Sequence, residues 1–142
     1  MTVYGTVIPW SHEREPDGTL RLWDVHGAEL GRQAAEWRAL IEVGPLCVAG
    51  DFNQAWTRGG YGTRALREAH HRAADRAGLA CLTAAESAND IPVIDHVLLS
   101  RDWADQHSAR VSLTWPGRRA DGLHMSDHPG VAIDLLAASP SR

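Results

Sequence analysis

The sequence contains no lysine, and all 14 of its basic residues are arginine. This absence excludes mechanisms that use a lysine Schiff base or the lysine of a phosphate-binding P-loop. The chain has only 2 cysteines, Cys47 and Cys81, which are too far apart for a CxxC zinc motif. Both lie in apolar, strand-like stretches, so buried thiols are the interpretation that this setting favours.

Long hydrophobic runs are also missing. No apolar stretch approaches the roughly 20 residues of a membrane span, and the start, MTVYGTVIPW, has no basic region ahead of an apolar segment. We therefore expect a soluble, cytoplasmic protein with no membrane span. The formal net charge of -4 counts against a protein that binds duplex DNA through many phosphate contacts, because such proteins are usually basic.

What the sequence does contain is the composition of an ordinary globular chain. Hydrophobic residues make up 44% and charged residues 23% of its 142 residues. Stretches typical of strands alternate with stretches of helical spacing, which predicts an α/β fold with a mixed sheet. The expected strands are 3–10, 46–49, 79–83, 93–99, 109–115 and 131–136, the expected helices are 28–43 and 63–78, and a turn or short helix is expected at 102–106. The intervening segments 11–27, 50–62, 84–92 and 116–126 are expected to be loops, and the last residues a fraying tail.

The first of three polar motifs follows the buried run LCVA, where Asp51 and Asn53 stand in the sequence GDFN. Ligand sites in open α/β sheets lie at the carboxyl ends of strands, and acid and amide side chains are poor strand residues. By itself an Asp-x-Asn sequence after a strand is more typical of a simple turn than of a functional site.

The second motif places Asp95 and His96 inside an otherwise apolar stretch. Neighbouring strand residues point to opposite faces, so one of the two is solvated while the other faces the core or an inner site. A buried aspartate would need a partner. The third motif, Ser126-Asp127-His128, directly precedes the last expected strand. Adjacent residues cannot form a catalytic triad, so the motif offers one carboxylate and one imidazole at the lip of a strand.

Taken together, the motifs hold the groups that phosphodiester hydrolysis requires. Carboxylates bind a hard divalent cation, an imidazole with an acidic neighbour transfers or holds a proton, and an amide holds an oxygen. The reaction needs a cation on the phosphate oxygens, a base or orienting group for water, and a donor at the developing charge.

The segments GDFN, IDHVLLS and SDHPGVAIDL, in this order, resemble the C-terminal half of the endonuclease/exonuclease/phosphatase superfamily, which has the DNase I-like fold. The opening VYGTVIPW also fits a strand of that half, so the resemblance covers nearly the whole chain. It implies a mixed β-sheet with helices on one outer face, as in one half of a four-layer α/β/β/α sandwich. Residues 1–142 would form a single partial domain. The family's N-terminal half, with its early asparagine and its metal-binding glutamate, has no counterpart in this chain.

The resemblance implies a metal-dependent phosphoesterase that hydrolyses phosphodiesters or phosphomonoesters, with Mg²⁺ as the expected cation and Mn²⁺ as an alternative. Asp51 would orient or deprotonate the attacking water, and Asn53 would bind the phosphate or position that water. Asp95 would hold the imidazole of His128, which contacts the phosphate, and Asp127 would be a metal ligand or a nearby acid. The substrate would be a nucleic acid, a nucleotide, a phosphorylated metabolite or a lipid head group.

Two further residues are candidates for binding the substrate. Arg64 lies near the start of a helix, where an arginine can bind phosphate, although the pattern favours a solvated arginine beside a capping Thr63. Trp56, like Trp10 and Trp115, lies near the expected strand ends or site loops and could stack on a ring of the substrate. For any single tryptophan, packing is the interpretation that the sequence favours.

A half sandwich would leave the inner face of its sheet exposed over more than the few hundred Å² that monomers normally tolerate. We therefore expect either a fragment or mis-started reading frame, favoured by Met1 standing directly before a strand, or a chain that self-associates or pairs with a missing half. Because the metal-binding glutamate has no match, a catalytically inactive or partner-dependent domain stays open as an alternative. A different metal hydrolase, with its site assembled across a homodimer, is a third interpretation. The absence of an HExxH motif counts against a zinc peptidase.

Overall fold

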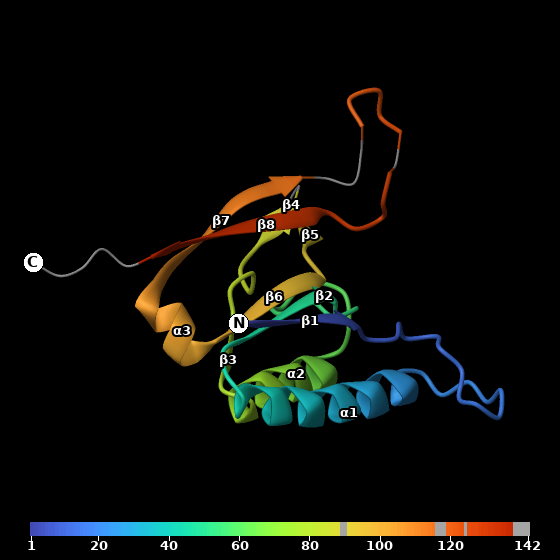
Figure 1. Ribbon diagram of the computed structural model, residues 1–142. Helices are drawn as coiled ribbons and strands as arrows, with labels where there is room; N and C mark the ends of the chain where they lie inside the picture. Colours follow the sequence, from blue (N-terminus) through green and yellow to red (C-terminus); the bar gives the residue numbers. More distant parts are fainter. Residues whose placement is uncertain (89–90, 116–118, 124, 138–142) are drawn as a thin grey trace, which may run out of the picture.

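The computed structural model describes residues 1–88, 91–115, 119–123 and 125–137. Its elements, in chain order, are β1 (Thr2–Val7), α1 (Asp24–Ile41), β2 (Leu46–Asp51), α2 (Arg64–Arg76), β3 (Leu79–Cys81), β4 (Ser87–Ala88), β5 (Ile91–Pro92), β6 (Asp95–Ser100), α3 (Arg101–Gln106), β7 (His107–Trp115) and β8 (Gly130–Ala137). Helices α1 and α2 cover one face of a four-stranded sheet, and the β7–β8 pair lies on the other side of that sheet (Figure 1).

The four-stranded sheet has the order β1-β2-β6-β3. Strands β1 and β2 are parallel, whereas β6 runs antiparallel to both β2 and β3. The expected mixed sheet with helices on one face is therefore confirmed. Strands β2 and β6 are the inner strands of the sheet and run antiparallel, so the end of β2 and the start of β6 lie side by side at one end of the sheet. The polar motifs converge at this point.

The core lies between this sheet and the two helices. Leu30 and Trp37 of α1 and Ala74 of α2 are buried against Val48 of β2 and Leu98 of β6. Fully burying a large apolar side chain stabilises a fold by roughly 1.5–3 kcal/mol, so this apolar layer holds the helices on the sheet.

The second helix begins and ends where its capping residues predict. The side-chain oxygen of Thr63 accepts a hydrogen bond of 3.2 Å from the backbone N–H of Leu66, which satisfies one free donor of the first turn. Gly78, just after the helix, has a φ of 63°, the left-handed conformation that glycine adopts at little cost.

The first helix differs from the expectation because it begins at Asp24, four residues before position 28. The added segment includes His26, which is buried and whose Nδ1 donates a hydrogen bond of 2.7 Å to the carbonyl of Pro9. A tertiary contact thus extends the helix across Gly27, a residue that sequence propensity assigns to the loop.

The last two strands also differ from the expectation of one sheet. Strands β7 and β8 pair with each other and form a separate two-stranded sheet, with an irregularity between Val111 and Leu113. The expected loop 84–92 contains the short strands β4 and β5, which form a further pair. In both pairs the partners are consecutive strands of the chain, and closing the loop between consecutive strands costs less conformational entropy than closing a longer one.

The sheet face away from the helices is partly open. Val3 and Val7 of β1 are 66% and 67% exposed, and β1 is an outer strand of the sheet. Within the described part of the chain, no helix has the length and apolar character needed to cross a membrane. The expected loop 116–126 and the expected tail lie partly outside the described residues, as does the side chain of Trp115.

Candidate functional site

Two carboxylates face each other where β2 and β6 run side by side. Asp51 is the last residue of β2, Asp95 is the first residue of β6, and the antiparallel register pairs them. Side chains of directly opposed residues lie on the same face, with Cβ atoms roughly 5 Å apart, and like charges in this position destabilise a sheet. The pair therefore requires a nearby positive charge or a shared proton.

Asn53 holds the turn that follows Asp51. Its backbone N–H donates to Oδ1 of Asp51 at 2.7 Å, and its side-chain amide donates to Oδ2 at 2.8 Å. The same amide donates to the carbonyl of Ile8 at 3.0 Å and so joins the turn to the segment after β1. Asn53 has a φ of 45°, a left-handed conformation that asparagine tolerates better than most residues. The motif thereby orients the carboxylate as well as ending the strand.

The glycine of the GDFN motif, Gly50, is required by the close packing of β2 against β1. Its φ is 148°, and a Cβ atom built on it would collide with the backbone carbonyl oxygen of Thr6 in β1. Only glycine lets the parallel strands β1 and β2 approach this closely next to the carboxylate.

His128 approaches the carboxylate pair from the segment before β8. Its Nδ1 lies 2.9 Å from Oδ2 of Asp95, an ion-pair distance. The contact falls short of hydrogen-bond geometry, so the buried Oδ2 of Asp95 has no hydrogen-bond partner among the described residues. On the other side of the ring, Nε2 lies 4.0 Å from Oδ1 of Asp127. The backbone N–H of His128 donates to Oγ of Ser126 at 3.0 Å, which shapes the turn.

Asp51, Asp95 and His128 form one group, which we name the carboxylate–histidine cluster. One nitrogen or oxygen atom of each residue lies within 4.8 Å of those of the other two. Burial raises the pKa of Asp51, and the hydrogen bonds from Asn53 and the charge of His128 act against this rise. Burial likewise raises the pKa of Asp95, where the charge of His128 opposes the rise and the charge of Asp51 adds to it. Such a group favours a bound cation or a shared proton.

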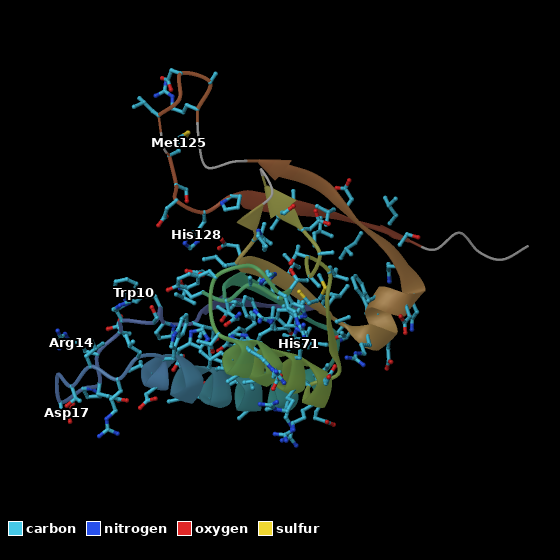
Figure 2. The ribbon with its side chains drawn as sticks, turned by 180° about the vertical axis from the view of Figure 1, so that it is seen from behind. Trp10, Arg14, Asp17, His71, Met125 and His128 are labelled. Carbon is cyan, nitrogen blue, oxygen red and sulfur yellow. The ribbon has the colours of Figure 1, made fainter. Side chains whose placement is uncertain are left out.

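Two cavities adjoin the cluster. One, of about 410 Å³, is lined by Asp95 and His128 together with residues of β2 and β8. The other, of about 470 Å³, is lined by Trp10, Tyr61, Pro92, Ile94, Asn53 and His128 among others, and is named the Trp10 cavity. Figure 2 shows Trp10, on the loop after β1, and His128 at the same end of the molecule.

Of the residues that the sequence nominates, the structure brings four together: Asp51, Asn53, Asp95 and His128. Asp127 lies at the margin of this group, with a side chain that is 95% exposed. It also lines the Trp10 cavity, so it borders the space beside the cluster without belonging to it.

Arg64 and Trp56 lie elsewhere. The side chain of Arg64 is 80% exposed and pairs with Glu68, whose Oε1 is 2.8 Å from its Nε. Trp56 packs edge-on against Phe52 and stacks on His71. Neither Arg64 nor Trp56 is among the described residues that line the two cavities.

The expectation that Asp95 and His96 point to opposite faces is confirmed. Asp95 is half-buried at the site, whereas His96 is buried on the helix side. His96 donates from Nε2 to the carbonyl of Gln54 at 3.0 Å, and its bare Nδ1 accepts from Oγ1 of Thr83 at 3.0 Å. It is therefore a satisfied core histidine.

Sequence reasoning missed a second buried histidine contact. His26 of α1 and His70 of α2 are both buried, and their Nε2 atoms lie 2.8 Å apart. Since Nδ1 of His26 donates to a carbonyl, its bare Nε2 accepts from His70, and Nδ1 of His70 is left without a partner among the described residues. The only available signal was that His70 falls four residues after Leu66 and three before Ala73, on the apolar stripe of α2.

A comparison of the chain with protein-family models found no match, and a search of curated proteins found none either.

Proposed function

We propose that this chain is a metal-dependent phosphoesterase of the endonuclease/exonuclease/phosphatase type, with the carboxylate–histidine cluster as its reactive centre. The observation that carries the proposal is the convergence of Asp51, Asp95 and His128, whose nitrogen or oxygen atoms lie within 4.8 Å of one another. These residues come from three motifs far apart in the chain, and the sequence resemblance assigns the same three to phosphate chemistry.

A divalent cation suits the groups that are present. Asp51 and Asp95 supply carboxylate oxygens, the ligands that Mg²⁺ and Mn²⁺ prefer, and the antiparallel register of β2 and β6 places the two carboxylates opposite each other. A bound cation would offset the repulsion between the two acids and would supply positive charge beside the phosphate oxygens.

Asp51 is the residue best placed to accept a proton from water. Its carboxylate is half-buried at the end of β2, and two hydrogen bonds from Asn53 fix its orientation. Both donor positions of the Asn53 amide are already used, on Asp51 and on the carbonyl of Ile8. Asn53 therefore acts in this proposal as a residue that positions Asp51.

His128 is the donor to the phosphate. Its Nδ1 lies 2.9 Å from Oδ2 of Asp95, which fixes the orientation of the ring. Its Nε2 lies on the opposite side of the ring, next to the Trp10 cavity that His128 helps to line. A charged imidazole in that position can hydrogen-bond to a phosphate oxygen and stabilise the charge that develops there.

The test is hydrolysis of bis(p-nitrophenyl) phosphate by the purified chain with Mg²⁺ or Mn²⁺. We expect a metal-dependent rate that falls by about 10²–10⁴-fold in Asp51→Asn and His128→Ala, as for loss of an acid–base group. Asp105→Asn, at an exposed position on α3, is the matched control and should retain the rate. A metal-dependent rate that is equal in wild type and His128→Ala, or no such rate at all, would contradict the proposal.

A second candidate function is that of a partner-dependent domain, which has no catalytic turnover until another chain completes its site. It is favoured by the exposed Val3 and Val7 on the outer strand β1. Size-exclusion chromatography with light scattering over a hundredfold range of concentration tests it, because an open apolar face should drive association. A chain that stays monomeric at every concentration and binds no hydrophobic dye would count against this candidate.

A further inference from the structure

The Trp10 cavity is a concave, mostly apolar space directly beside the carboxylate–histidine cluster. Asn53 and His128 form the wall that it shares with the cluster, and Trp10, Tyr61, Pro92 and Ile94 give it aromatic and apolar walls. Its volume of about 470 Å³ falls within the roughly 300–1,000 Å³ typical of small-molecule sites. A group attached to a phosphate held at the cluster would extend into this space.

Trp10 has the character of a stacking surface rather than of a core residue. It is 52% exposed, although most other tryptophans of a small domain pack inward. Its ring contacts the ring of His12, with centroids 5.0 Å apart and a tilt of 41°. This contact supports one side of the indole, while the indole also lines the cavity.

The second aromatic residue of the cavity wall, Tyr61, is held in place by its neighbours. The hydroxyl group of Tyr61 lies 3.0 Å from Oγ of Ser11, which is itself 2.8 Å from Nδ1 of His12. The ring of Tyr61 packs on that of Trp23 at a centroid distance of 5.5 Å. Because these contacts within the protein already fix Tyr61, little ordering of the wall is needed on binding, which favours affinity for a flat group.

The charges around the cavity favour a single phosphate group. Among the described residues that line it, the ionisable side chains other than that of Tyr61 are His12, Asp127 and His128, and there is no arginine. A nucleic-acid strand offers a row of phosphates and is normally bound along a positively charged groove. The cavity instead offers aromatic and apolar walls for one planar group and a single anion-binding edge at His128.

We propose that the Trp10 cavity binds the planar ring of a mononucleotide-like phosphate ester whose phosphate lies at the carboxylate–histidine cluster. This inference rests on the proposed function and names its substrate class: phosphate esters with an aromatic base, in preference to sugar phosphates, lipid head groups and polynucleotides. Trp10 and Tyr61 determine this specificity, and neither takes part in the chemical step.

Titration calorimetry in the presence of Mg²⁺ tests the proposal. The ligands are the 5′-phosphonate analogue of AMP, the corresponding phosphonate of ribose, adenosine, and a ten-nucleotide phosphorothioate strand. The phosphonates carry a C–P bond that the enzyme cannot hydrolyse. We expect the AMP analogue to bind at least about tenfold more tightly than the ribose analogue, because stacking of a base on an aromatic side chain contributes this much affinity.

Substitutions at an exposed position make the test specific. Trp10→Ala should abolish the preference for the AMP analogue and leave binding of the ribose analogue unchanged, whereas Trp10→Phe should retain most of the preference. Trp103→Ala is the control, because Trp103 stacks on His107 and does not line the cavity.

Equal affinity of the two phosphonates overturns the proposal and leaves the phosphoesterase function standing. Tighter binding of the oligonucleotide than of the AMP analogue overturns the choice of a mononucleotide. If adenosine binds as tightly as the AMP analogue, and Trp10→Ala abolishes this binding, the Trp10 cavity binds the base but the phosphate contributes nothing. This result contradicts the proposed function. Absence of binding by all four ligands overturns both.

Discussion

Acid should unfold this protein because its interior holds three neutral histidines. His26, His70 and His96 are all buried, and burial lowers the pKa of each. The pKa of His70 falls from its ordinary value of 6.5 to about 3, and that of His96 to about 4. Neighbouring histidines add to the effect at His70, since its own ring faces that of His26.

The fall in stability at low pH follows from the difference in proton binding between the unfolded and the folded chain. Below pH 6.5 the unfolded chain binds protons that the folded protein excludes until the pH reaches about 3 for His70 and about 4 for His96. The contribution of these groups to stability is therefore complete above pH 6.5 and is lost as the pH falls through that window. At 1.36 kcal/mol per unit of pKa shift, the loss is roughly 5 kcal/mol for His70 and roughly 3 kcal/mol for His96.

This loss is comparable with the 5–15 kcal/mol of stability of a typical domain. Asp51 and Asp95 oppose it, because a raised pKa in the folded state stabilises the fold as the pH drops below that pKa. Each neutral buried histidine contributes up to about 1.4 kcal/mol per pH unit. We therefore expect the free energy of unfolding to fall steeply between pH 6.5 and 4.5.

The assay is urea unfolding, followed by tryptophan fluorescence and circular dichroism, at pH 7.5, 6.5, 5.5 and 4.5. His70→Gln removes one of the titrating groups and keeps an amide donor for His26, so the slope below pH 6.5 should fall by about 1.4 kcal/mol per pH unit. His71→Gln, at the exposed neighbouring position, should leave the slope unchanged. A wild-type free energy that stays constant from pH 6.5 to 4.5, or a slope that His70→Gln does not alter, would refute the reasoning.

Three further predictions concern backbone geometry, capping and the acid pair. Gly50→Ala should cost roughly 1–3 kcal/mol in urea unfolding, because it adds strain and a collision with Thr6; Gly18→Ala, also at positive φ but in open space, should cost less, and equal costs would count against the collision. Thr63→Ala should lower the free energy of unfolding by about 1 kcal/mol, because the helix cap is lost. Thr63→Ser keeps a hydroxyl group and should retain most of the stability that the cap provides. In EDTA at pH 7, Asp95→Asn should raise the melting temperature, because burial penalises the charged carboxylate. Mn²⁺ should raise the melting temperature of the wild type and not that of Asp95→Asn, and an equal metal-dependent rise in both would show that the cation binds elsewhere.

The local structure of the chain could be predicted where local chemistry decides it. Thr63 and Gly78 bound α2 because a capping oxygen and a residue free to adopt positive φ act within one helical turn. The extended start of α1 was not predictable in this way, since it depends on a hydrogen bond from His26 to Pro9, 17 positions earlier in the chain. Residues 24–27 have weak preferences of their own, and the tertiary contact outweighs them.

The candidate site was predictable in its membership and not in its geometry. Polar residues at the ends of apolar runs mark Asp51, Asp95 and His128, because such residues are unfavourable there unless they have a role. The sequence resemblance assigned the imidazole of His128 to Asp95, but the sequence could not show which ring nitrogen lies against Asp95 or that Asp127 faces solvent. These neighbouring residues differ in the direction of their side chains, which the turn before β8 decides.

By itself, the sequence determined most of the longer helices and strands, the mixed α/β class, the absence of lysine chemistry and the three polar motifs, all of which depend on residue type and short-range spacing. The tertiary structure alone decided which residues meet. The register of β2 and β6 places Asp51 opposite Asp95, and the packing of α1 on α2 buries His26 against His70. The loop after β1 folds back so that Trp10 lines a cavity with His128. Each of these contacts joins residues distant in the chain. Such contacts form only when the whole apolar core packs together and excludes water, because only the packed core fixes the relative positions of the elements that carry these residues.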